Sequence, residues 1–550
     1  MTKKFRPEKP DKTVLFTNLK TKHKHILKWL LLLVWPFLGF LLLPFSKGNF
    51  TAPFSTVIYS AEGRLLGAEV ADDNQWRFPF LNSDTLPQKF ETCILEFEDK
   101  AFYSHPGINP FSIARAIQQN WEAGKVVSGG STITMQLARM YYQNQPRNIP
   151  QKIKELFLAL RLELWLSKSE ILNYYSCLAP YGGNVVGLET AAWRYYNRPA
   201  HHLSWGESAL LAVLPNAPSL LYPGKNAELL EQKRNRLLDQ LLAHGKMDSI
   251  ANFLAKREEL PLQPKPLPLG CYHLLQFIIK QKGSGQNFKT SIGSETQNKV
   301  QRIAQSFQRG LAGNGVNNLA ILVVNNHTQK VVAYQGNLPQ GGQHADKVDC
   351  VQSTRSTGSL LKPFLFASLL QSGTRTSASL IPDVPINISG FKPQNFTHNF
   401  SGAIPFQKAL SKSLNIPFVI ALRNFGIGPF LENLKSFGLK SIDKSAGYYG
   451  LSLILGGGES SLWELTQAFS FFGQKLNGNG VNAVDVILDS EPEAMNPLPF
   501  SDGVIFQTLT ALTDVQRPGV QGNWKAFLSS QKIAWKTGTS YGHRDAWAIG

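Results

Sequence analysis

The sequence contains four tetrads of the form Ser-x-x-Lys, and only one of them begins an apolar stretch that can form a buried helix. The tetrads start at Ser359, Ser389, Ser441 and Ser529. Ser389 lies in the turn-like sequence ISGFKPQN, Ser441 in a polar loop, and Ser529 directly before a predicted strand. The run from Ser359 to Leu370 is apolar, which predicts a helix with the serine in its first turn. The local context therefore selects Ser359.

A serine at such a position can act as a nucleophile. The first turn of a helix carries unpaired backbone N–H groups and the positive end of the helix dipole. Lys362 lies three residues on and faces the same side. A partly desolvated lysine can lose its charge and accept the serine proton. The tripeptides Ser413-Leu414-Asn415 and Lys536-Thr537-Gly538 follow in the order found at serine acyl-transfer sites. Either tripeptide alone could be structural, but all three motifs in order predict an acyl-transfer site.

These motifs lie in the blocks RSTGSLLKPF, SLNIP and AWKTGTSYGHRDAWAIG. The blocks resemble the transpeptidase domain of class A penicillin-binding proteins, most closely the penicillin-binding protein 1C branch. The resemblance implies an α/β fold like that of the serine β-lactamases. It also implies that Ser359 attacks the D-Ala-D-Ala carbonyl of a peptidoglycan stem peptide, that Lys362 is the general base and that Ser413 relays the proton.

The same resemblance assigns the remaining residues of the site. Asn415 would orient the substrate. Lys536 and Thr537 would hold the terminal carboxylate, and Gly538 would let the substrate approach the strand. The backbone N–H groups of Ser359 and Thr539 would form the oxyanion hole. β-Lactams are implied as ligands.

The first half of the chain carries a second set of blocks: EDKAFYSHPG at 98–107, GGSTITMQL at 129–137 and KIKE at 152–155. Taken singly, each is ordinary, because Glu155 lies on the polar side of an amphipathic pattern and is typical of a surface charge. Together, the carboxylates Glu98 and Glu155 suit a reaction at a sugar diphosphate. One can remove a hydroxyl proton, while loop N–H groups and nearby cations hold the leaving pyrophosphate.

With APYGGNVVGLETAAWRYY and LSWGESALLAVLPNAPS, these blocks resemble the peptidoglycan glycosyltransferases. The resemblance implies a lysozyme-like, mostly helical fold that polymerises lipid II into β-1,4 glycan strands with inversion. Glu98 would activate the acceptor hydroxyl, and Glu155 would assist departure of the leaving group. The implied donor or phosphate site consists of Ser131, Thr132, Gln136, Arg139, Arg147 and Lys154. No cofactor is required; a divalent cation near Glu98 is compatible with the family, although no ligand cluster indicates one.

Some positions depart from the pattern of the glycosyltransferase family. Gln151 stands where arginine is common, Met135 replaces a common glutamine, and Ser176-Cys177 replaces Leu-Asn. None of these changes touches either carboxylate. We expect the Cys177 change to act only locally, on the fold or the site.

The N-terminal region predicts a membrane anchor. Residues 1–28 contain nine Lys and Arg against two acidic residues, a large part of the net charge of +18. The segment Trp29–Phe45 then runs for 17 residues without a charge, close to the ~20 residues of a membrane-spanning helix. No small-x-small cleavage site follows, so we expect an uncleaved anchor rather than a signal peptide. Basic residues before the span place the N-terminus in the cytoplasm and the rest of the chain outside it. Together with the family resemblance, this predicts an anchor in the bacterial inner membrane and catalytic domains in the periplasm.

The sequence predicts a multidomain chain with the following order. A basic tail (1–28) and a transmembrane helix (29–45) precede a mostly helical glycosyltransferase domain (50–258), a proline-rich linker region (259–290) and a transpeptidase domain (291–550). Lys152–Leu166 predicts a helix with Ile153, Leu156, Phe157, Leu160 and Leu164 on one face.

We expect the transpeptidase domain to be cut short at Gly550, because the family continues beyond this strand. The four cysteines form no CxxC, which favours free, buried thiols and no metal site.

The leading hypothesis is a bifunctional peptidoglycan synthase with lipid II, nascent glycan strands and stem peptides as substrates. Three alternatives stay open: a second domain that binds β-lactams without cross-linking, a D,D-carboxypeptidase, and a scaffold for wall synthesis with both sites idle. We expect the membrane and wall-synthesis proteins as partners. The cluster of positive charge at the N-terminus is explained by the membrane anchor, and the domains after the anchor lie outside the cytoplasm. No nucleic acid partner is therefore expected.

Overall fold

The computed structural model describes residues 39, 50, 52–79, 85–125, 129–142, 148–478, 480–495, 500–515 and 531–550. These residues form two compact units. The first contains residues up to Thr56, Glu69–Leu267 and Ser284–Asn287; the second contains Val57–Ala68, Pro268–Gly283 and Phe288–Gly550. The chain therefore contributes a short segment to the second unit before it builds most of the first.

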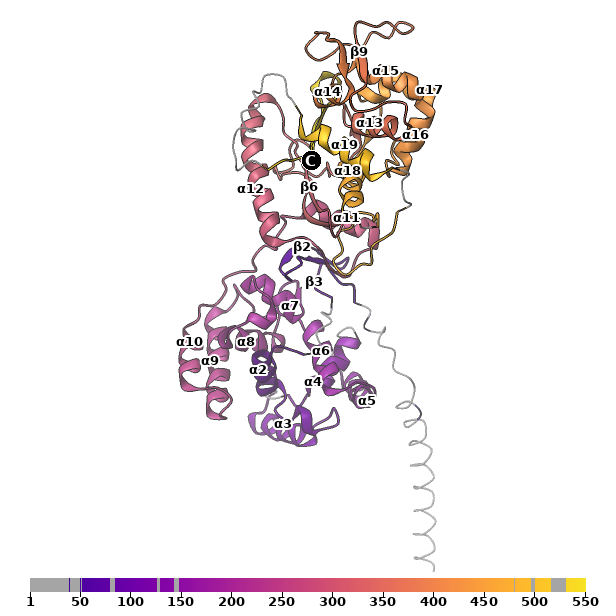
Figure 1. Cartoon of the computed structure of the whole chain (residues 1–550). Coiled ribbons are helices and arrows are strands. Elements are labelled where there is room, and N and C mark those ends of the chain that lie inside the picture. Colours follow the sequence, from indigo (N-terminus) through magenta and orange to yellow (C-terminus); the bar gives the residue numbers. More distant parts are fainter. Residues whose placement is uncertain are drawn as a thin grey trace, which may run out of the picture. The chain divides into compact units, whose positions relative to one another are not determined.

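The first unit is mostly helical (Figure 1). Its longer helices are α2 (Gln88–Glu98), α3 (Pro110–Ala123), α4 (Ile133–Tyr141), α5 (Ile149–Trp165), α6 (Lys168–Leu178), α8 (Trp205–Val213), α9 (Ala227–Ala243) and α10 (Ser249–Arg257). Its short elements are η2 (Phe102–Ser104), α7 (Leu188–Ala191), the π-helical turn η3 (Ala192–Tyr196), η4 (Ala200–His202), η5 (Leu214–Asn216) and the parallel strands β3 (Trp76–Arg77) and β4 (Val185–Val186). The prediction of a mostly helical first half is confirmed.

The core of the first unit lies where α2 and α4 are enclosed by their neighbours. Helix α2 packs against α8 and α9, and α4 packs against α5 and α6. Phe90, Leu137, Leu162 and Leu210 are fully or almost fully buried in this core. Before α8, Ser204 and Glu207 form a capping box. The packing fixes α2 and α4, which carry the predicted carboxylate and loop residues.

Helix α5 faces the core with a different side from the one its apolar stripe suggests. Ile153, Phe157 and Leu164 are 49%, 37% and 61% exposed, whereas Glu155 is only 7% exposed. The buried side consists of Leu158, Ala159, Leu162 and Glu155. The interpretation of Glu155 as an ordinary surface charge is therefore wrong. The helix is apolar on more than one side, so periodicity alone does not identify its core face.

A buried carboxylate on α2 joins this helix to the end of α9. Glu96, with a side chain 1% exposed, pairs with Lys100 at 2.6 Å, Lys246 at 2.9 Å and His244 at 3.0 Å. Burial alone would raise the pKa of Glu96, but the hydrogen bonds from Lys100 and Lys246 outweigh burial and lower it. The carboxylate is therefore ionised in the folded protein and stabilises the first unit at neutral pH.

We expect Glu96→Gln to lower the free energy of unfolding of the first unit by about 2–3 kcal/mol at pH 7, because it leaves buried donors without their charged partner. The loss of stability relative to the parent should be complete at pH values above the ordinary glutamate pKa. It should shrink as the pH falls through the pKa of Glu96 in the folded protein, which is lower than the ordinary value. Denaturant unfolding at several pH values measures this difference. The exposed Glu228→Gln serves as the control and should change stability by no more than about 0.5 kcal/mol. Equal unfolding midpoints for Glu96→Gln and the parent would contradict the account.

The second unit contains helices and several small antiparallel sheets. Its helices are α11 (Tyr272–Lys282), α12 (Ser294–Leu311), α13 (Lys362–Gln371), α14 (Phe406–Ser411), α15 (Ile416–Phe425), α16 (Ile427–Ser436), α17 (Ala446–Tyr449), α18 (Leu462–Leu476) and α19 (Asp502–Thr513), with short turns η6 (Ala312–Asn314), η7 (Gly450–Leu455) and η9 (Tyr541–His543). Its strands are β1 (Thr56–Tyr59), β2 (Leu65–Glu69), β5 (Asn287–Lys289), β6 (Ile321–Asn325), β7 (Lys330–Gln335), β8 (Arg355–Ser356), β9 (Leu380–Asp383), β10 (Gly402–Pro405), β11 (Glu459–Ser460), β12 (Lys536–Thr539) and β13 (Ala546–Ile549). Strands β2, β1 and β5 are neighbours in one sheet, and the others pair as β6–β7, β8–β11, β9–β10 and β12–β13.

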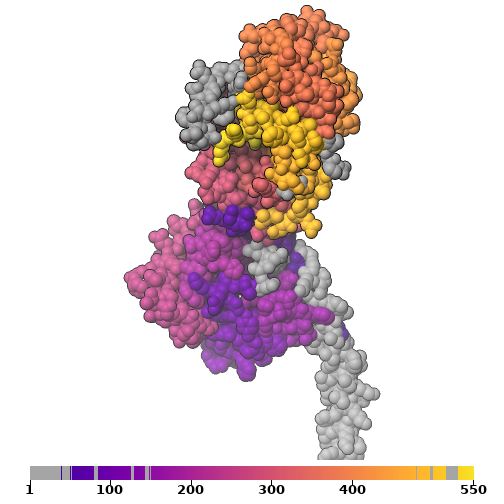
Figure 2. Space-filling model, in the orientation of Figure 1, coloured from indigo at the N-terminus to yellow at the C-terminus, as the bar shows by residue number. Residues whose placement is uncertain are grey.

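Helix α13 is the centre of the second unit. Phe364, Leu365, Phe366 and Ala367 are each 0% exposed, and α13 packs against α14, α15, α16 and α19. In the space-filling view, the orange-to-yellow residues from α13 to α19 form one continuous mass (Figure 2). The sequence prediction of a buried apolar helix after Ser359 is confirmed. Strands β6 and β7 pair antiparallel, and the strand predicted after Ser529 is β12, which pairs with β13.

Three further predictions concern the N-terminal anchor, the cysteines and the linker. The predicted anchor at 29–45 lies outside the described residues except for Gly39. Within the described ranges, no helix is both long enough and apolar enough to cross a bilayer. The four cysteines are free, as predicted; Cys93, Cys271 and Cys350 are buried, whereas Cys177 is half-buried. The predicted linker at 259–290 is irregular through its prolines but also contains α11.

Candidate functional site: two acid–base clusters

Ser359 lies in the turn directly before α13, not inside the helix. The helix begins at Lys362, whose backbone N–H donates to the Ser359 carbonyl at 3.3 Å. The prediction that Ser359 occupies the first helical turn is therefore wrong by one turn. Gly358, directly before Ser359, has a φ of +54°, so a helix cannot extend back through it. Residues 358–361 form a turn instead. Ser359 is half-buried, and its Oγ has no hydrogen-bond partner within the described part of the chain.

Two glycines bring β12 against this turn. A Cβ on Gly358 would lie 2.6 Å from the Thr539 nitrogen, and a Cβ on Gly538 would lie 2.6 Å from the Thr357 carbonyl oxygen. Only residues without side chains allow this approach. Trp547 on β13 donates from Nε1 to the Ser356 carbonyl at 2.8 Å. The Lys-Thr-Gly strand is thus held beside Ser359.

Lys362 is the centre of a polar cluster beneath this turn. It is 0% exposed and donates to the Ser413 carbonyl at 2.9 Å and to Asn415 Oδ1 at 2.8 Å. Lys536, 1% exposed, donates from Nζ to Ser413 Oγ at 2.8 Å. Burial, and then the charge of Lys536, lower the pKa of Lys362 well below its ordinary value. The cluster therefore holds a buried lysine that readily becomes a neutral base.

A break between two helices brings the Ser-Leu-Asn motif into this cluster. The structure has α14 and α15 with Ser413-Leu414-Asn415 between them, and Ser413 has a φ of +54°. A serine held in the left-handed region is strained, and such residues cluster at functional sites. The break directs Ser413 and Asn415 toward the two lysines.

In the first unit, Glu98 lies at the end of α2 and faces α4. Gln136 Nε2 donates to Glu98 Oε2 at 2.7 Å, while Glu98 Oε1 is buried without a partner within the described ranges. Burial raises the pKa of Glu98; the Gln136 hydrogen bond opposes this effect, and the charge of Asp99 adds to it. A carboxylate with a raised pKa is well suited to taking up a proton in a reaction.

The residues after Glu98 lock this segment to the start of α4. Asp99 accepts from His105 Nε2 at 3.0 Å and from the Ile133 backbone N–H at 3.1 Å. The Gly107 N–H donates to His105 Nδ1, which assigns the proton to Nε2. Thr132 caps α4 and donates to the Gly107 carbonyl at 2.6 Å. The hydroxyl of Thr132, a predicted substrate ligand, is therefore used inside the fold.

Glu155 lies on the buried side of α5 and is 7% exposed. Helix α5 packs against α4, and α4 also carries Gln136, the hydrogen-bond partner of Glu98. Glu98 therefore contacts α4 through Gln136, and Glu155 lies on a helix that packs against α4.

The other predicted donor-site residues have different environments. Ser131 and Lys154 are exposed, Arg139 is half-buried in the last turn of α4, and Arg147 lies outside the described residues. The sequence analysis missed two residues beside Glu98. Lys233 on α9 donates to Asn216 Oδ1 at 3.4 Å, and both residues lower the pKa of Glu98. Asn216 lies in the block LSWGESALLAVLPNAPS, but no sequence pattern points to Lys233.

Comparison with known proteins gives a consistent family. A transglycosylase family model matches residues 63–242, and a penicillin binding protein transpeptidase domain model matches residues 319–545. Penicillin-binding protein 1C of Escherichia coli strain K12 is 34% identical over 528 residues, covering 95% of this chain and 67% of the relative. The chain belongs to the class A penicillin-binding proteins. The transglycosylase match falls on the helical unit, and the transpeptidase match falls on the unit that contains Ser359.

Other class A relatives are more distant. Penicillin-binding protein 1B of Vibrio cholerae is 26% identical and covers 89% of this chain and 66% of its own length. The crystal structure of penicillin-binding protein 1A from Haemophilus influenzae superposes with a TM-score of 0.49 at 18% identity, covering 90% of this chain and 86% of that one. The chain therefore spans about two thirds of the length of its 1C and 1B relatives.

Proposed function

We propose that this class A penicillin-binding protein polymerises lipid II into β-1,4 glycan strands and acylates D-Ala-D-Ala stem peptides at Ser359 to cross-link them. The observation that carries the proposal is that each unit contains its own buried acid–base cluster. Glu98 lies in one, and Lys362, Ser413 and Lys536 lie in the other. Incubation with lipid II tests the first reaction, and labelling with fluorescent penicillin tests the second.

In the glycosyl transfer, Glu98 takes the proton of the acceptor 4-hydroxyl as that oxygen bonds to the anomeric carbon of the donor. The bond from that carbon to the lipid diphosphate breaks, and the configuration inverts. Glu155, with Arg139, Arg147 and Lys154, assists the leaving diphosphate. Burial raises the pKa of Glu98, and Lys233 and Asn216 partly oppose this effect because both favour the carboxylate.

In the acyl transfer, neutral Lys362 takes the proton of Ser359 Oγ as this atom attacks the penultimate D-Ala carbonyl. Ser413 accepts from Lys362 at its carbonyl and from Lys536 at its Oγ. Its hydroxyl then passes the proton to the leaving D-Ala amine. Lys536 and Thr537 hold the terminal carboxylate, and the N–H groups of Ser359 and Thr539 stabilise the oxyanion. An acceptor amine then attacks the acyl carbonyl, the ester bond to Ser359 Oγ breaks, and the new amide is the cross-link. The proton lost by the amine returns to Ser359 Oγ through Lys362.

We expect the rate of penicillin acylation to rise with pH, because only neutral Lys362 can accept the serine proton. The half-maximal rate should lie well below pH 10.4, the ordinary lysine pKa, because burial and Lys536 lower the pKa of Lys362. Stopped-flow labelling over a pH series measures this profile. A rate that does not depend on pH, or one that reaches its half-maximum only near pH 10, would contradict the role of Lys362.

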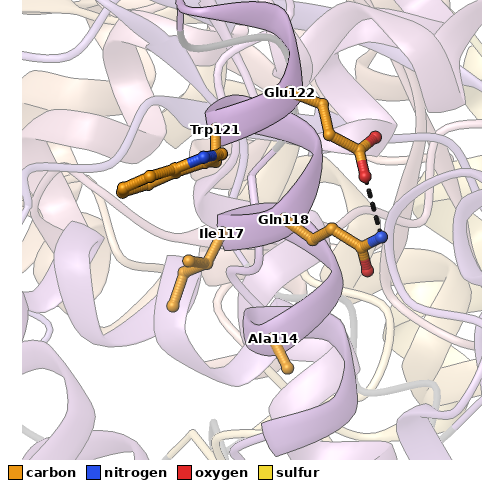
Figure 3. A pocket seen from close by; sticks show the side chains of 5 residues that line it. All are labelled: Ala114, Ile117, Gln118, Trp121 and Glu122. Carbon is orange, nitrogen blue, oxygen red and sulfur yellow. Dashed lines mark hydrogen bonds between the residues drawn. The ribbon is translucent and has the colours of Figure 1, made fainter.

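We propose that the chain is anchored in the bacterial inner membrane by 29–45, with both units in the periplasm. Exposed apolar side chains of the first unit support contact with lipid. Ile117 and Trp121 extend from one side of α3 and are 63% and 86% exposed. On a neighbouring side, Gln118 donates to Glu122 at 2.8 Å (Figure 3). Exposed Phe157 and Leu164 on α5 have the same apolar character.

We propose that neither site needs a resident cofactor. A divalent cation brought by the lipid diphosphate would act beside Glu98. Within the described residues, no three His, Cys, Asp or Glu side chains lie close enough together to hold a metal ion. The proposed partners are lipid II, glycan strands, stem peptides, β-lactams and proteins of wall synthesis; no nucleic acid is among them.

A further inference from the structure

Asn395, in the loop between β9 and β10, supports the Ser-Leu-Asn motif from behind. Its side chain is 1% exposed, and Oδ1 accepts from the backbone N–H of Asn415 at 2.9 Å and of Ile416 at 3.3 Å. These groups are the first donors of α15, which has no cap of its own and whose next residue, Pro417, has no N–H. Asn395 thus caps the helix from a distant point in the sequence.

The preceding residue completes this support. Asn415 Nδ2 donates to the Gln394 carbonyl at 2.8 Å, which leaves Asn415 Oδ1 facing Lys362 Nζ at 2.8 Å. Gln394 and Asn395 therefore hold both the backbone and the side chain of Asn415. Because Asn415 Oδ1 is one of the two acceptors of Lys362, the loop also determines where the buried lysine lies.

A buried carboxylate fixes the direction in which the Asn395 amide points. Asp383 is 0% exposed; its Oδ1 accepts from Asn395 Nδ2 at 2.7 Å, and its Oδ2 accepts from the Ser401 N–H at 2.9 Å. A carboxylate can only accept hydrogen bonds, so it holds Nδ2 on its own side and turns Oδ1 toward α15. The charge of Asp383 also polarises the amide and strengthens the bonds that Oδ1 accepts.

We propose that Asn395 is a positioning residue for the acyl-transfer reaction, oriented by Asp383 and acting on Lys362 through Asn415. The inference rests on the proposed transpeptidase function. Asn395 does not touch the reacting atoms. Its contribution is to keep Asn415 Oδ1 in contact with Lys362 and one Asn415 amide hydrogen bound to Gln394, so that the other hydrogen can meet the substrate.

The test compares Asn395→Ala and Asn395→Asp with the parent and with Asn387→Ala. Asn387 accepts from the Gly390 N–H at 3.0 Å in an exposed turn of the same connection, so it is a matched control. The second-order rate of labelling by fluorescent penicillin is measured on the full chain from pH 6 to pH 9, beside thermal melting. Asn387→Ala should match the parent in rate and profile.

Asn395→Ala should label about 10- to 100-fold more slowly, because it removes hydrogen bonds to charged and buried groups, and its pH midpoint should shift. Asn395→Asp keeps the shape of the side chain but faces Asp383 with a second carboxylate. Its rate should fall as the pH rises, because the two groups can share a proton only at the lower pH. A merely structural cap would change the melting temperature and leave both pH profiles unchanged.

The outcomes separate this inference from the function on which it rests. A parent chain that takes up no label contradicts the proposed transpeptidase function and the inference with it. A parent that labels normally beside Asn395 variants of unchanged rate and profile contradicts the inference alone. If Asn395→Ala does not fold, the profile of Asn395→Asp decides: a curve that superposes on the parent curve overturns the proposal.

Discussion

Ser359→Ala should abolish labelling by fluorescent penicillin while the chain still polymerises lipid II. The substitution removes the proposed nucleophile, and loss of a catalytic serine lowers rates by about 10⁴-fold or more in serine hydrolases. The fold should persist, because Ser359 lies in a turn and its Oγ has no hydrogen-bond partner within the described chain. In-gel fluorescence measures the labelling, and product length on the same sample measures polymerisation.

The control for this prediction is Ser441→Ala, which removes the serine of another Ser-x-x-Lys tetrad in the same unit. It should label at the parent rate. Persistent labelling of Ser359→Ala would show that the nucleophile lies elsewhere. Loss of labelling in Ser441→Ala alone would show that the context of the apolar helix selected the wrong tetrad.

Glu98→Gln should stop glycan polymerisation while penicillin labelling continues. A glutamine keeps the shape and can still contact Gln136, but it cannot accept the hydroxyl proton. Loss of a general base costs typically about 10²- to 10⁴-fold in rate. Lipid II consumption, followed by separation of the glycan products, measures the effect.

The matched control for the glycosyl transfer is Glu228→Gln on the exposed first turn of α9. It should polymerise lipid II like the parent. A Glu98→Gln chain that makes glycan at a rate close to the parent rate would show that another group takes the proton. Simultaneous loss of labelling would instead indicate that the substitution damages the whole chain.

The residues that lie within contiguous motifs could be predicted from the sequence, because their spacing alone indicates that they can react together. Ser359 and Lys362 are three residues apart, and a buried apolar helix after them was sufficient to distinguish this tetrad from the others. The exact helix start was not predicted, because it depends on the positive φ of Gly358, and this conformation is imposed by contact with β12. The local sequence pattern therefore identified Ser359 and Lys362, whereas tertiary contacts determine how the two residues lie relative to the helix.

Residues that meet only through the fold could not be predicted. Asn395 caps a helix that begins 21 residues later, and the charge of Lys233 on α9 lowers the pKa of Glu98 on α2. The burial of Glu155 was missed for a related reason: α5 is apolar on several sides, and only packing against α4 determines which side is inside. The assignment of residues 57–68 to the second unit likewise follows from strand pairing over a long sequence distance.

One chain is proposed to perform both reactions, and analysis of the product that it forms from lipid II measures both of them. The parent chain is incubated with lipid II, the product is digested with a muramidase, and the peptide fragments are separated. The account predicts cross-linked dimers from the parent, uncross-linked glycan from Ser359→Ala and no glycan from Glu98→Gln. Glycan with trimmed, monomeric peptides would instead indicate a D,D-carboxypeptidase, and glycan with intact monomers a domain that binds β-lactams without cross-linking. A parent chain that labels with penicillin but makes no dimers would contradict the claim.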